Sequence, residues 1–275
     1  MAKKTANDKI VMDWLLEEDQ PAIRYLTLTE LLDRPEDDPE VRDSRQAIPA
    51  RGWAADILAR QDPAGWWVSK DAFYRPKYLS SNWMLLILAD LGMTREDSRI
   101  RKAADEWIKR FAKPDGGFGM DGSKSSHLCV VGNTARALVQ FGYADHPKVA
   151  KAFEWMEKNR SHLGGWSCFG SGRNLDSWEP MSAFAVYPRP KWTAGMQRAV
   201  ETLSEVELLF VGEILIAEHQ HGVLVHAGAD RLQRFATMHL AQVDRAHFAG
   251  EYGRERRDGD GHGCGLRGER GDHPD

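Results

Sequence analysis

The chain of 275 residues lacks a long uncharged hydrophobic run and has only three cysteines. Its longest strongly apolar run extends from Leu208 to Ala217 and contains Glu213, which is far short of the about 18–20 residues that a membrane-spanning helix needs. The first residues lack the apolar core of a secretion signal, and three cysteines cannot all pair within one chain. We therefore expect a cytoplasmic protein in a reducing compartment, with no transmembrane segment.

A strong excess of charge of one sign is also absent. The sequence has 41 acidic and 37 basic residues, so the net charge is −4 at pH 7. This balance gives no electrostatic reason to expect nucleic acid or an anionic membrane as the main partner. Hydrophobic residues make up 42% of the chain, which is enough to bury a substantial core.

Two further kinds of signal are missing. Runs of alternating β-branched residues between turns are almost absent, which argues against strands. No phosphate-cradling glycine loop, nucleophile elbow or zinc-protease helix motif is present in the sequence. Any chemistry must therefore be inferred from less specific patterns.

Helical periodicity fills most of the chain up to about residue 200. Pro21 occupies a position typical of a first helical residue, and an apolar stripe follows it until Pro35. Apolar residues three and four apart predict further helices over residues 78–91, 98–111, 131–141 and 147–159. The fold class that this pattern favours is all-α.

Three glycine-aromatic turns punctuate these helices, ending at Trp67, Phe118 and Trp166. Phe118 follows Trp67 by 51 residues and precedes Trp166 by 48. Gly92 and Gly142 mark a second type of stop, where glycine ends a helix in the left-handed conformation. The sequence thus predicts tandem helical hairpins, each closing on a glycine-aromatic turn.

The turn segments QDPAGW at 61–66, PDGGF at 114–118 and GGW at 164–166 resemble the repeat motif of squalene-hopene cyclases and protein prenyltransferases. The stretch 178–192 is similar to a bacterial branch labelled squalene-cyclase-like. The resemblance implies an α/α toroid, in which two concentric rings of helices surround an aromatic-lined cavity. Only the first of the three turns keeps the glutamine of the family motif.

We expect toroid repeats over residues 1–200, a divergent helical segment over 201–249 and a disordered tail over 250–275. The tail is rich in glycine, arginine, aspartate and histidine and has almost nothing apolar. The carboxyl-terminal part is either a divergent end or the product of a shifted reading frame, which leaves the toroid incomplete. An open ring exposes an apolar edge and favours a homodimer.

The resemblance implies an isoprenoid or another apolar small molecule as the ligand, because aromatic faces stabilise carbocations. Trp83 and Trp178 are the candidate aromatic contacts. The alternative interpretation is that the tryptophans are packing residues between helices. It applies to four of them: Trp66, Trp107, Trp155 and Trp166.

Cyclases of this family protonate their substrate with an Asp-x-Asp-Asp cluster, which is absent here, as is the Asp-Asp-x-x-Asp magnesium motif. Asp176 and Glu179 are the candidate catalytic acids, at the start of a helix. Alternatively, Ser177 caps that helix and both acids complement its dipole.

Prenyltransferases of the family hold zinc with Asp, Cys and His ligands, which makes His127, Cys129 and Cys168 candidate zinc ligands. Alternatively, the cysteines are small buried hydrophobes. Arg189 and Lys191 are candidates for binding a diphosphate, or else solvated loop charges. Three functions remain open: an isoprenoid cyclase, a non-catalytic toroid that binds an apolar ligand or a protein partner, and a zinc-dependent prenyltransferase.

Overall fold

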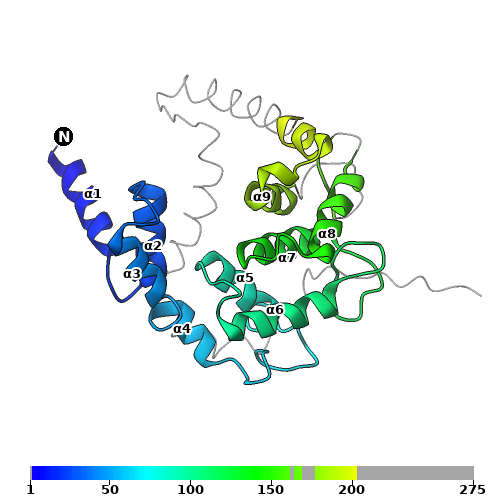
Figure 1. The fold of residues 1–275 in the computed structure, drawn as a ribbon, viewed down its shortest axis with the longest axis horizontal. Helices are drawn as coiled ribbons and strands as arrows, with labels where there is room; N and C mark the ends of the chain where they lie inside the picture. Colours follow the sequence, from blue (N-terminus) through cyan, green and yellow to red (C-terminus); the bar gives the residue numbers. More distant parts are fainter. Residues whose placement is uncertain (1, 162–163, 169–176, 203–275) are drawn as a thin grey trace, which may run out of the picture. The chain divides into compact units, whose positions relative to one another are not determined.

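The computed structural model describes residues 2–161, 164–168 and 177–202, which are helices joined by turns and loops (Figure 1). Within these ranges there is no β-strand, and only an isolated bridge pairs Ala112 with Phe118. The predicted all-α class is confirmed, whereas closure into a toroid stays a prediction. None of the helices in the described ranges is long and apolar enough to cross a membrane.

The helices observed include those expected from periodicity and also α1 (Ala2–Leu15), α3 (Pro39–Ala47), α4 (Gly52–Ala59) and α9 (Trp178–Val186). Helix α6 (Ser98–Phe111) has the predicted bounds. Helix α5 (Ser81–Asp90) begins after the predicted residue 78, because Tyr78 has a left-handed φ of 65°, which is not a helical conformation. The elements in chain order are α1 (Ala2–Leu15), α2 (Pro21–Leu26), a π-helical turn (Thr27–Leu31), α3 (Pro39–Ala47), α4 (Gly52–Ala59), α5 (Ser81–Asp90), α6 (Ser98–Phe111), α7 (Leu128–Gln140), α8 (Pro147–Lys158), α9 (Trp178–Val186) and a 3₁₀ turn (Arg189–Lys191).

Side-chain caps begin several of these helices. The carboxylate of Asp38 accepts the N–H of Glu40 at 2.8 Å at the start of α3. The carboxylate of Asp97 accepts the N–H of Arg99 at the same distance at the start of α6. Each cap satisfies an amide that has no partner inside its own helix.

Helices α5 and α7 end at the predicted glycine stops. Gly92 and Gly142 have φ values of 80° and 95°. The next residue then donates its N–H to a carbonyl five residues back, from Met93 at 3.0 Å and from Tyr143 at 2.8 Å. This bonding is that of a Schellman motif, which glycine permits because it lacks a Cβ.

The three glycine-aromatic turns share one backbone geometry. In each turn, a glycine with positive φ donates its N–H to the carbonyl of the residue three positions earlier. That earlier residue donates its own N–H to the carbonyl of the residue four positions after it. The second bond is 2.8 Å at Asp62, 2.9 Å at Lys113 and 2.7 Å at Ser161. The turns are therefore alike in structure as well as in sequence, while their extension into a complete ring of repeats stays a prediction.

The aromatic residue that closes each turn is buried. Trp67, Phe118 and Trp166 are nearly or fully inaccessible. The two indoles also bond to the preceding helix, because the Nε1–H groups of Trp67 and Trp166 each donate at 2.8 Å to a carbonyl ten residues earlier. Trp166 is thus a packing residue, as the alternative interpretation held. In the first turn, the buried closing residue is Trp67 rather than Trp66, which is only partly buried.

Helix α7 lies in contact with α5, α8 and α9, and its packing against α9 is the most extensive. A Cβ added at Gly132 would lie 2.5 Å from the carbonyl carbon of Glu179, so glycine allows the α9 backbone to approach α7 closely. Four residues further along α7, the guanidinium of Arg136 bonds to both carboxylate oxygens of Asp90, the last residue of α5. The Gly132 contact lies near the starts of α7 and α9, which carry part of the candidate site, and the Arg136 contact joins the second half of α7 to the end of α5.

Candidate functional site

Helices α5, α7 and α9 each follow a glycine-aromatic turn and are bonded to it at or near their first residue. In every case the hydrogen-bond donor is a backbone N–H, either of the turn or of the residue that precedes the helix. The bonds run from Trp67 N–H to Ser81 Oγ at 2.9 Å, from His127 N–H to Phe118 O at 3.0 Å, and from Trp166 N–H to Ser177 Oγ at 3.2 Å. The three helix starts are thus each held directly against the preceding turn.

Most of the residues predicted as site residues lie at these helix starts or on a turn. We define the helix-start residues as Trp83 of α5, His127 and Cys129 of α7, and Trp178 and Glu179 of α9. Cys168 follows the third turn, two residues after Trp166. Asp176 lies outside the described residues.

The two predicted cysteine ligands are in contact. The backbone N–H of Cys129 donates to Sγ of Cys168 at 3.3 Å. Both side chains are partly buried, and the two cysteines are not joined in a disulfide. One helical turn further along α7, Gly132 packs against the backbone of Glu179. The start of α7 therefore touches both the third turn and α9.

The zinc hypothesis requires a third ligand at the same place. His127 precedes α7 as its N-cap residue, although its side chain makes no capping bond. In the described ranges, no three His, Cys, Asp or Glu side chains are grouped so that they could hold a metal ion. This part of the chain gives the zinc hypothesis no structural support, and the metal content of the protein stays to be measured.

Trp83 belongs to an aromatic group that continues to the surface. Its indole N–H donates to the carbonyl of Tyr74 at 3.0 Å, and its ring centroid lies 5.4 Å from that of Tyr74 and 5.0 Å from that of Tyr78. Tyr78 is 60% exposed. The carboxylate of Asp121 holds this loop by accepting the N–H of Tyr74 at 3.0 Å. The three rings form an aromatic surface beside the start of α5.

At the start of α9, the indole of Trp178 is 52% exposed. Ser177 is the N-cap residue of α9, as the alternative interpretation placed it, but its side chain makes no capping bond to the helix, and its hydroxyl accepts the N–H of Trp166. The hydroxyl joins the helix to the turn. Glu179 lies in the first turn of α9, where a carboxylate also complements the helix dipole.

Arg189 and Lys191 lie in the short turn after the other end of α9. The guanidinium of Arg189 lies 3.8 Å from the ring centroid of Trp192. The Lys191 ammonium pairs with Asp145 at 2.6 Å, and this hydrogen bond raises the pKa of Lys191. The structure thus separates these two cations along the chain from the helix-start residues of α9 and gives each of them a partner in the protein.

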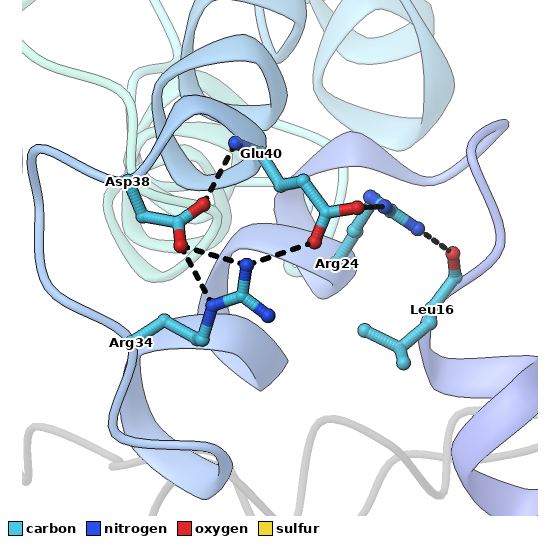
Figure 2. Close-up of polar contacts among 5 residues, drawn as sticks. All are labelled: Leu16, Arg24, Arg34, Asp38 and Glu40. Atoms are coloured by element: carbon cyan, nitrogen blue, oxygen red, sulfur yellow. Dashed lines mark hydrogen bonds and ion pairs between the residues drawn. The ribbon is translucent and has the colours of Figure 1, made fainter.

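A charged network that the sequence did not predict links α2, α3 and the segment after α1 (Figure 2). Arg34 bonds to Asp38 at 2.7 Å and to Glu40 at 3.2 Å. Arg24 reaches the same Glu40 carboxylate at 3.3 Å and also donates to the carbonyl of Leu16. The only sequence signal was the acidic loop that ends at Asp38, the residue that caps α3.

This network borders a surface hollow of about 310 Å³. Charged and polar side chains dominate its walls. The lining residues are Glu18, Pro21, Arg24, Glu40, Asp43, Ser44 and Arg51. A hollow with this lining suits a polar ligand rather than a hydrocarbon, because burying unpaired charge beside apolar surface is costly. It is therefore unsuited to an isoprenoid chain.

A scan against protein-family models finds no match for this chain. A squalene-hopene cyclase from Bradyrhizobium diazoefficiens is 30% identical in an alignment of 119 residues that covers 38% of this chain and 17% of that protein. The chain thus spans less than a fifth of that relative. The similarity supports a distant relationship to the squalene cyclase and prenyltransferase-like proteins.

Proposed function

We propose that this chain is a terpenoid-cyclase-like protein that binds an isoprenoid hydrocarbon along the starts of α5 and α9. The observation that carries the proposal is the aromatic surface of Tyr74, Tyr78 and Trp83, which provides exposed apolar area beside α5. The distant similarity to a squalene-hopene cyclase supports the same class of ligand.

The ligand would contact the rings through their faces. Trp178 offers a second, half-exposed indole at the start of α9. Aromatic faces bury hydrocarbon and also attract a passing carbocation, an attraction of about 0.5–2 kcal/mol for each well-placed ring. Trp83 is held in place by its bond to the Tyr74 carbonyl, so its ring orientation is preset.

Cyclisation would start from a carboxylic acid near the ligand. In this step the acid transfers its proton to one carbon of a terminal double bond, leaving a carboxylate and a carbocation on the neighbouring carbon. Loss of a proton from the final cation restores a neutral alkene. Glu179 and Asp176 are the proposed acids, and the close packing of the Glu179 backbone against Gly132 positions Glu179 relative to α7.

The second candidate function is binding without turnover. The sequence lacks the Asp-x-Asp-Asp acid of the family cyclases. The two indoles at Trp67 and Trp166 donate their N–H groups within the protein and serve packing. A protein with these features can hold an apolar ligand, or an apolar face of a partner, without converting it.

The experiment combines binding and turnover on the full chain. Squalene dispersed in mild detergent is incubated with the protein, products are measured by gas chromatography with mass detection, and binding is followed by tryptophan fluorescence. We expect Trp83→Leu and Trp178→Leu to weaken binding at least fivefold. Trp14→Leu, which changes a 43% exposed tryptophan on α1, is the matched control.

The acids are tested by Asp176→Asn and Glu179→Gln. Loss of product in either variant with binding retained supports the cyclase. Saturable binding with no product in the unmodified protein supports the second candidate. If squalene binds the unmodified protein no better than it binds the Trp83→Leu and Trp178→Leu variants, the proposed isoprenoid binding along α5 and α9 is overturned. Prenyl transfer is tested separately, by metal analysis of the purified protein and by transfer from farnesyl diphosphate to a thiol.

A further inference from the structure

The contact between Cys129 and Cys168 joins two thiols that are far apart in the sequence. The Sγ of Cys168 lies 3.3 Å from the backbone nitrogen of Cys129, across a separation of 39 residues. The Sγ of Cys129 is itself only three bonds from that nitrogen. Rotation about the two Cα–Cβ bonds places the sulfurs, while a disulfide also requires the backbone to hold the Cβ atoms about 3.8 Å apart.

Both cysteines are carried by well-anchored backbone. Cys129 is the second residue of α7, in the helix turn whose amides lack partners within the helix. Cys168 follows Trp166, which is bonded through its indole to the Met156 carbonyl and through its backbone N–H to Ser177. These bonds hold the turn that precedes Cys168 against α8 and the start of α9.

The amide that contacts Cys168 favours this cysteine as the attacking thiol. A backbone N–H at the start of a helix stabilises negative charge on an atom placed there. The attacking species in thiol exchange is a sulfur anion, and the same anion is the leaving group when the bond is reversed. The Sγ of Cys168 occupies this position.

We propose that Cys129 and Cys168 form a dithiol site that exchanges with small-molecule disulfides and closes into an intramolecular disulfide. The Sγ of Cys168 loses its proton and attacks one sulfur of a disulfide RSSR, whose other sulfur leaves as RS⁻ and takes up that proton. The thiol of Cys129 then attacks Sγ of Cys168 and expels the second RSH. Two protein thiols are oxidised, and one RSSR is reduced to two RSH.

The test uses reduced full-length protein and 2-hydroxyethyl disulfide, which is uncharged and needs no charged binding site. Peptides are mapped without reduction by mass spectrometry. We expect one Cys129–Cys168 cross-link and two released thiols for each chain. Because the bond closes a 39-residue separation, the melting temperature should rise by about 5–15 °C and return to its initial value after reduction.

Single variants assign the roles. Cys129→Ser should accumulate a stable mixed disulfide on Cys168, because no second thiol remains to displace it. The Cys168→Ser protein should form its adduct on Cys129 at least tenfold more slowly than the Cys129→Ser protein forms its adduct on Cys168. Cys264→Ser is the matched control, since it removes the third thiol, which lies outside the described residues, and should leave the cross-link unchanged.

Two results would overturn the proposal. One is separate adducts on Cys129 and Cys168 with no cross-link in the Cys264→Ser protein, a measurement that needs neither of the other variants to fold. The other is stoichiometric zinc in the purified protein that is lost in Cys168→Ser, because the sulfurs would then be metal ligands. The proposal does not depend on the isoprenoid function, so either can fail alone.

Discussion

Trp67 and Trp166 make the same indole hydrogen bond in two different turns, each donating Nε1–H at 2.8 Å to the carbonyl ten residues earlier, which is Ile57 in one case and Met156 in the other. Both rings are buried. The bond ties the end of a helix to the turn that follows it. Because that turn also holds the start of the next helix, each of these indoles connects two helices.

Replacing Trp166 should therefore destabilise the fold more than its position in a turn suggests. We expect Trp166→Ala to lower the free energy of unfolding by about 3–5 kcal/mol, because it leaves a large cavity. Trp166→Phe should cost about 1–3 kcal/mol, since it mainly removes the N–H donor. Urea denaturation followed by circular dichroism measures both, with Trp14→Ala as an exposed control. Equal losses of unfolding free energy in Trp166→Ala and Trp166→Phe would contradict this account.

Gly132→Ala should destabilise, although a glycine-to-alanine change inside a helix usually stabilises by about 0.5–1 kcal/mol. The added Cβ would lie 2.5 Å from the carbonyl carbon of Glu179, so α7 and α9 must move apart. We expect a loss of about 1–3 kcal/mol. Asn133→Ala on the same helix is the control, and thermal unfolding is the measurement. A more stable Gly132→Ala protein would show that α9 does not pack there as described.

The Asp90–Arg136 ion pair should contribute to the stability of the fold, because the two side chains are only 17% and 18% exposed to solvent. Asp90→Ala leaves the guanidinium partly buried without its main counter-charge, and we expect a loss of about 2–4 kcal/mol. The double variant Asp90→Ala with Arg136→Met should recover part of it. A double-mutant cycle by chemical denaturation gives the coupling. Additive effects of the two changes would exclude a direct interaction between α5 and α7 through this pair.

The Asp97 cap predicts a loss of stability in acid. Hydrogen bonds from the Arg99 side chain lower the pKa of Asp97 below its ordinary value of 3.8, against the opposing effect of burial. A depressed pKa contributes stability that is present above pH 3.8 and is lost as the pH falls through the folded-state value. Asp97→Ala should cost about 1 kcal/mol at pH 7 and flatten the pH dependence below pH 4. Asp97→Asn retains a capping oxygen and should cost less at pH 7. An unchanged acid profile in both variants would argue against this role.

The raised pKa of Tyr25 predicts a loss of stability in alkali. Burial and the hydrogen bond to Glu36 raise the pKa of its phenol from 10.0 to about 12. A raised pKa contributes stability that is complete below pH 10 and is lost as the pH rises towards 12. Tyr25→Phe should therefore lose less stability than the unmodified protein over this range. Phenolate absorbance, followed together with circular dichroism, tests this, and a Tyr25 that titrates near pH 10 before unfolding would refute it.

The sequence by itself determined the features that depend on neighbours in the chain. Apolar spacing set the bounds of α6, Pro21 began α2, and the φ requirements of Gly92 and Gly142 placed two helix ends. The glycine-aromatic turns were recognisable for the same reason, since their bonds span only three or four residues. Local hydrogen bonds and backbone sterics are encoded in a short stretch of residues, so a pattern in that stretch suffices.

Only the tertiary structure decided the contacts between distant segments. Ser177 looked like a cap, but its hydroxyl is taken by the amide of Trp166. The amide of Cys129 meets the sulfur of Cys168 across 39 residues, and Lys191 pairs with Asp145. Each of these side chains has several chemically suitable partners in the sequence. The choice among them depends on which helices pack together, and that follows from burying the whole core rather than from any local pattern.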